Sequence, residues 1–101
     1  MELEGVLYGE LGLHVRRAFG AGRRDDIGDM VGLPDTVIQV ANWSDVIRAV
    51  REKPLQAEQQ RARAGVTFAC AYVRLRGGVW RAVMTPQQWT TMWREATTVP
   101  Y

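Results

Sequence analysis

The alternation of hydrophobic and polar positions changes period along the chain and predicts a mixed α/β order. In residues 2–19, apolar side chains recur at three- and four-residue spacing, which indicates a helix in spite of its glycines, and residues 14–19 can extend as a first strand. A short apolar segment at 28–32 and a β-branched run at 36–40 are separated by turn residues at 33–35, which predicts two adjacent strands.

The middle of the chain predicts a helical region followed by a strand. Ser44 is a suitable N-cap for a helix to about Glu52, and Pro54 starts a further helical stretch that ends at Gly65. The apolar run at 66–75 alternates too little for a half-exposed strand, so it is expected to be covered on both faces.

The C-terminal part predicts a hairpin and a last helix. The Arg-Gly-Gly sequence at 76–78 predicts a tight turn into a return strand at 79–84. Thr85 and the proline after it predict the start of a helix. Three apolar residues are expected to mark the buried face of that helix, namely Trp89, Met92 and Trp93.

The length of 101 residues predicts a single domain, residues 1–101, with a thin core. There is no run of about 18 apolar residues and no cationic leader, so we expect a cytoplasmic protein without a membrane span. A single cysteine, Cys70, excludes an intrachain disulfide and a cysteine zinc site, and its apolar surroundings predict a buried small side chain.

The charge total conceals an asymmetry in residue type. A net charge of +2 is too small to indicate a nucleic-acid partner, yet all basic residues except Lys53 are arginine. Arginine binds phosphate bidentately and stays ionised when partly buried. A GC-rich genome would give the same composition, so composition leaves both explanations open.

The segment from Gly28 to Asn42 is the most informative about chemistry. Period-two alternation places Gln39 and Ala41 on one face of a strand, and Asp29 converges with them if that face looks toward it. Metal-dependent nucleases need such a convergence, because carboxylates hold the ion and a nearby lysine helps to activate or position the attacking water.

The run GDMVGLP at 28–34, followed by VIQVAN at 37–42, resembles the PD-(D/E)XK nuclease superfamily. More narrowly it is similar to the short Holliday-junction-resolvase-like proteins of actinobacterial phages, which read GD-I-x-GLPG and then V-E-V-K-N. The resemblance extends over residues 2–96. It implies a restriction-endonuclease-like α/β core, with a mixed central sheet of four to five strands flanked by helices. It also implies a homodimer that acts on branched DNA in recombination.

Matched position by position, the resemblance makes Asp29 a metal ligand and Glu4 a supporting carboxylate for Mg²⁺ or Mn²⁺. Gln39 stands in place of a metal-binding glutamate, and Ala41 stands in place of the catalytic lysine. A neutral amide is a weak ligand for a hard cation, and alanine cannot contact water or phosphate. The resemblance therefore implies an endodeoxyribonuclease whose cleavage activity is weakened or lost. Any remaining activity would require Mg²⁺ or Mn²⁺, and an inactive protein would need no cofactor.

Three explanations are compatible with these departures. The chain is a natural pseudonuclease that still binds DNA or a partner, an active variant with a relocated ligand or base, or a nuclease silenced by engineering. Relocated groups would come from acids and cations near the motif, of which the candidates are Asp25, Asp26, Asp35, Asp45, Lys53 and several arginines.

Phosphate contacts are expected from arginines near the motif and the hairpin, namely Arg16, Arg17, Arg23, Arg24, Arg74 and Arg76. The resemblance thus implies a phage- or prophage-encoded DNA-binding homodimer in the cytoplasm of a bacterial host. The alternative is a non-enzymatic interaction module that reuses the nuclease fold to modulate a host or phage protein.

Overall fold

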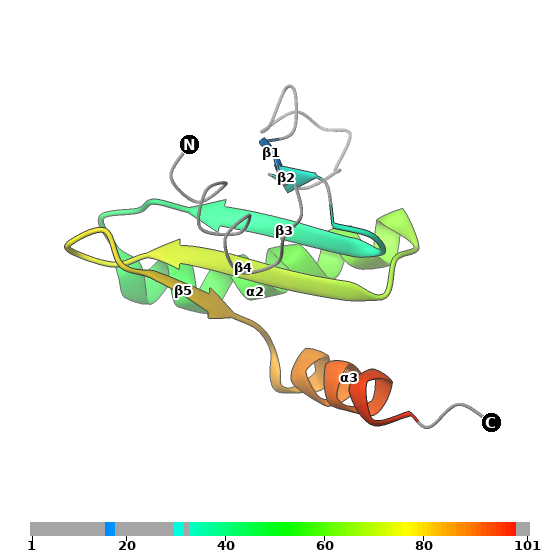
Figure 1. The fold of residues 1–101 in the computed structure, drawn as a ribbon. Helices are drawn as coiled ribbons and strands as arrows, with labels where there is room; N and C mark the ends of the chain where they lie inside the picture. Colours follow the sequence, from blue (N-terminus) through cyan, green and yellow to red (C-terminus); the bar gives the residue numbers. More distant parts are fainter. Residues whose placement is uncertain (1–15, 18–29, 32, 99–101) are drawn as a thin grey trace.

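The structure of the chain, a computed structural model, describes residues 16–17, 30–31 and 33–98. The described strands form one sheet in the order β1-β2-β3-β4-β5. The elements are β1 (Arg16–Arg17), β2 (Met30–Val31), β3 (Thr36–Ala41), α2 (Val46–Ala64), β4 (Phe68–Arg74), β5 (Trp80–Val83) and α3 (Pro86–Thr97), as Figure 1 shows. The predicted helix within residues 2–19 lies outside the described residues.

The sheet is mixed, because β3 and β4 pair in parallel whereas β4 and β5 pair antiparallel. The strands β3, β4 and β5 form its main part, and β1 and β2 add two residues each at one edge. The prediction of an α/β fold with a mixed sheet is confirmed.

Helix α2 connects the parallel strands and covers one face of the sheet along β3 and β4 (Figure 1). Small residues make this contact close: Ala41 of β3 and Ala49 of α2 are buried and cluster with Val73 of β4. Without bulky side chains between them, the helix and the strands can approach each other closely, and no space remains there for a longer side chain. The core of the domain therefore lies between α2 and the β3–β4 pair.

The opposite face of the sheet has Ile38 at its centre, packed against half-buried residues that include Tyr72 and Trp80. Cys70 also lies in β4 and is half-buried, and burial raises the pKa of its thiol to about 11. Burial likewise raises the pKa of the Tyr72 hydroxyl. Strand β4 alternates buried and half-buried positions and has no exposed one, so one of its faces is covered more completely than the other.

Helix α2 differs from the sequence prediction at its start and at its middle. Its N-cap is Asp45 rather than Ser44, and the Asp45 carboxylate accepts a hydrogen bond of 3.0 Å from the backbone N–H of Arg48. The helix continues through Pro54 to Ala64 instead of restarting there. It ends at Gly65 in the left-handed conformation, φ 71°, as predicted.

Helix α3 begins as predicted, because the Thr85 hydroxyl accepts a hydrogen bond from the backbone N–H of Gln88 at 3.1 Å. Its buried face differs from the prediction at the two tryptophans. Gln88 is buried and Met92 is half-buried, whereas Trp89 and Trp93 are exposed. Neither described helix is both long enough and apolar enough to cross a membrane.

Candidate functional site

Gln39 and Ala41 lie on the same face of β3, the face that α2 covers. Both are buried, with 4% and 1% of their surface exposed. They pair across the parallel ladder with Ala71 and Val73 of β4, so the alternation inferred from the sequence holds in the structure. Because α2 packs on this face, the two positions lie inside the domain and not in an open groove.

The amide of Gln39 is hydrogen bonded at both ends to α2. Lys53 donates from Nζ to Gln39 Oε1 at 3.1 Å, and Gln39 donates from Nε2 to Oε1 of Gln60. The Lys53 ammonium also lies over the indole of Trp43, 5.2 Å from the ring centroid, where the ring face attracts a cation. The single lysine of the chain is thus held beside Gln39.

This arrangement does not suit a divalent cation at Gln39. The oxygen that would have to bind Mg²⁺ or Mn²⁺ already accepts a hydrogen bond from an ammonium group, and the positive charge of that group repels a second cation. Among the described residues there is no cluster of three or more His, Cys, Asp or Glu side chains that could hold a metal. Asp29 and Glu4, the two ligands expected from the resemblance, lie outside the described residues.

Two of the acids considered as relocated ligands have structural contacts instead. Asp35 adopts φ 55°, and its carboxylate accepts a hydrogen bond from the backbone N–H of Thr67 at 2.9 Å, which ties the start of β3 to the start of β4. Asp45 caps α2. The other two, Asp25 and Asp26, lie outside the described residues.

A pocket of about 750 Å³ opens where the parallel strands β3 and β4 end. In sheets with parallel strands and helical crossovers, ligands bind outside the carboxyl ends of the strands, next to the start of the following helix. The pocket has this position. Its walls are the β3–α2 connection, the first turn of α2 and the β4–β5 hairpin: Asn42, Trp43, Ser44, Asp45, Val46, Ile47, Arg74, Leu75 and Arg76.

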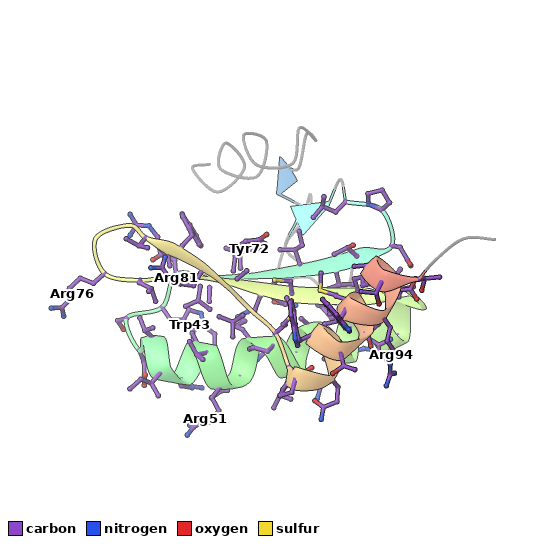
Figure 2. The ribbon with its side chains drawn as sticks, turned by 60° about the horizontal axis from the view of Figure 1, so that its bottom comes forward. Trp43, Arg51, Tyr72, Arg76, Arg81 and Arg94 are labelled. Atoms are coloured by element: carbon purple, nitrogen blue, oxygen red, sulfur yellow. The ribbon has the colours of Figure 1, made fainter. Side chains whose placement is uncertain are left out.

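The hairpin supplies the positive charge of this pocket. Gly77 and Gly78 have φ of 85° and 81°, a conformation that favours glycine, and they form the turn that was predicted. The guanidinium of Arg74 lies against Gly78, where an added Cβ would come within 3.0 Å of it. Figure 2 shows Arg76 projecting outward from the hairpin. Two of the predicted DNA-binding arginines therefore line one pocket.

The other four predicted DNA-binding arginines are not among the described residues that line this pocket. Arg16 and Arg17 form β1 at the far edge of the sheet, and Arg23 and Arg24 lie outside the described residues. Sequence reasoning did not identify Trp43 and Asn42 as pocket residues. Their position directly after a buried β-branched strand could have indicated them, because loops at that place commonly bind ligands.

The chain matches no protein-family model, no curated protein and no solved structure.

Proposed function

We propose that this chain is a DNA-binding protein with a PD-(D/E)XK-like core, of the kind that phages use on branched or double-stranded recombination DNA. The observation that supports this best is the pocket at the ends of β3 and β4, whose lining includes Arg74 and Arg76. Guanidinium groups beside a concave surface are the usual means of binding a phosphate backbone.

In this proposal, metal-dependent phosphodiester cleavage is weakened or lost. Support comes from the burial of Gln39 and Ala41 and from the ammonium of Lys53 on the Gln39 amide. If cleavage remains, Asp29 is the surviving ligand for Mg²⁺ or Mn²⁺, and the protein acts as a homodimer on two strands. Incubation of a four-way junction with either metal tests this, since cleavage by the wild type that Asp29→Asn abolishes would establish a residual nuclease.

The DNA-binding proposal is tested by fluorescence anisotropy with a labelled four-way junction and a duplex of equal length. Each phosphate contact contributes about −0.9 to the slope of log K against log salt, so Arg74→Ala with Arg76→Ala should lower the magnitude of the slope by roughly 2. The matched control is Arg51→Ala with Arg63→Ala, which removes the same charge from exposed positions on α2, where Figure 2 labels Arg51. Absence of binding by the wild type at low salt would refute the proposal.

A second candidate function is a non-enzymatic protein-interaction module. The observation in its favour is the pair of exposed tryptophans on α3, because exposed indoles are frequent at protein interfaces. This candidate is favoured over the first if the chain binds a host or phage protein and has no affinity for DNA.

A further inference from the structure

Helix α3 presents two large aromatic side chains to solvent. Trp89 and Trp93 are 60% and 58% exposed, and their four-residue spacing places them one turn apart on the same side of the helix. Tryptophan is on average strongly buried in folded proteins. We name this surface the tryptophan face; it consists of Trp89 and Trp93 together with the exposed Thr90 and Thr97.

The outward position of the tryptophan face follows from how α3 is held. Gln88, with 3% of its surface exposed, donates a hydrogen bond from Nε2 to the Glu58 carboxylate of α2 at 2.8 Å. Thr85 caps the same turn through the backbone N–H of Gln88. Because a polar anchor occupies the inner side of the first turn, Trp89, which follows it about 100° further round the helix, is left largely exposed.

We propose that the tryptophan face is the contact surface between two copies of this chain, related by a twofold axis. The inference deepens the proposed function, in which the protein acts as a homodimer, by naming the surface through which the copies associate. In such an interface the same patch meets itself, so the patch must be self-complementary.

The charge of α3 favours a second copy over nucleic acid. The helix carries one arginine, Arg94, and one glutamate, Glu95, so it has no excess of positive charge with which to follow phosphates. The tryptophan face itself is uncharged, so two copies can approach without like-charge repulsion.

The exposed area agrees with a dimer contact. An indole side chain offers up to about 250 Å², so the four half-exposed tryptophans of two copies contribute on the order of 600 Å². A specific interface buries at least about 1,000 Å² in total. A helix of 12 residues is about 18 Å long, and its flanking side chains can supply the remainder.

Sedimentation equilibrium of the full chain without DNA tests the proposal. The wild type should be a dimer at micromolar concentration, and Trp89→Ala with Trp93→Ala should raise the dimer dissociation constant at least about 100-fold, because central tryptophans dominate interface energies. The control is Val50→Ala, which removes an exposed apolar side chain from α2 and should leave the constant unchanged. Circular dichroism should show an unchanged fold, and the single variants provide the measurement if the double variant does not fold.

A monomeric wild type, or a double variant that dimerises as strongly as the wild type, would overturn the assignment. If the wild type is monomeric and its tryptophan emission is quenched by a single-stranded oligonucleotide, the occupant is nucleic acid and the proposal is wrong. The sedimentation experiment contains no DNA, so it tests only whether the chain dimerises. DNA binding is tested separately by the Arg74 and Arg76 variants, and the two proposals can therefore fail independently.

Discussion

The contact between Lys53 and Gln39 allows a sharp test of the site geometry. Gln39 is 4% exposed, and its Oε1 accepts a hydrogen bond from the Lys53 ammonium at 3.1 Å. Replacing Lys53 by methionine keeps an unbranched side chain of similar length but leaves the buried oxygen without this donor. A hydrogen bond from a charged group contributes about 1.5–3 kcal/mol, and a buried acceptor left unsatisfied costs about 1–3 kcal/mol.

We therefore expect Lys53→Met to lower the free energy of unfolding by about 2 kcal/mol, which for a domain of this size lowers the melting temperature by roughly 10 °C. Gln39→Met removes the acceptor, and the double variant places two apolar side chains in contact. Each single variant leaves one partner of the hydrogen bond unpaired, whereas the double variant removes both partners. The loss of stability in the double variant should therefore be smaller than the sum of the two single losses, by about 1.5–3 kcal/mol.

The assay is urea denaturation of the wild type, both single variants and the double variant, followed by circular dichroism. Arg51→Met is the control, since Arg51 is an exposed cation on the same helix and its loss should change stability by less than about 0.5 kcal/mol. If the effects of the two substitutions add to within about 0.5 kcal/mol, the contact does not hold Lys53 at Gln39 and the argument against a cation there fails.

Three further predictions concern other parts of the fold. Ala41→Lys should destabilise the domain by at least about 3 kcal/mol in urea denaturation, because Ala41 is packed against Ala49 and Val73 and a buried ammonium would have to be accommodated there; a stable, soluble variant would refute the packing. Asp45→Ala should cost about 1 kcal/mol through loss of the N-cap, measured in the same way, and no loss would mean that the cap is dispensable. Burial raises the pKa of the Cys70 thiol from an ordinary value of 9.0 to about 11. The free energy of unfolding should therefore be highest below pH 9 and should decline as the pH rises toward 11, because the unfolded chain loses the thiol proton first. Cys70→Ala should show a smaller decline in urea denaturation, and equal declines in the two proteins would contradict the raised pKa.

The sequence was informative wherever a local rule determines the backbone. The turn at Gly77 and Gly78, the end of α2 at Gly65 and the start of α3 at Thr85 were all predicted at the correct residues. In each case a conformation that one residue type favours, or a cap within three residues, fixes the structure. Such rules need no knowledge of the rest of the fold.

The buried face of α3 was predicted wrongly because it depends on a partner far along the chain. Counting apolar residues at helical spacing favoured Trp89 and Trp93 for burial, yet Gln88 is the residue that is buried. Its hydrogen bond joins it to Glu58, 30 positions away. Hydrophobicity alone cannot anticipate that a polar residue takes the inner position of the helix. Because Gln88 does so, the two tryptophans remain exposed and form the tryptophan face.

The division of α2 at Pro54 was wrong for a related reason. Proline removes one helical hydrogen bond and costs roughly 3 kcal/mol in a helix interior, so a break was expected. In the structure, Ala49 on one side of Pro54 and Ala57 on the other are both completely buried. We attribute the continuity of the helix to this packing on both sides of the proline, which offsets the lost bond.

A continuous α2 also explains why Lys53 meets Gln39, and it links the residues at positions 39 and 41. From the end of β3, Gln39 lies two residues back, about 7 Å along the strand. Lys53 lies seven residues into the helix that returns along that strand, about 10 Å from its start, so the two reach nearly the same level. The closeness of α2 requires a small side chain at Ala41, and a lysine there would push the helix, and Lys53 with it, away from Gln39. Alanine at 41 and lysine at 53 are therefore parts of a single arrangement, and introducing a lysine at 41 would remove the contact that now places an ammonium group beside position 39.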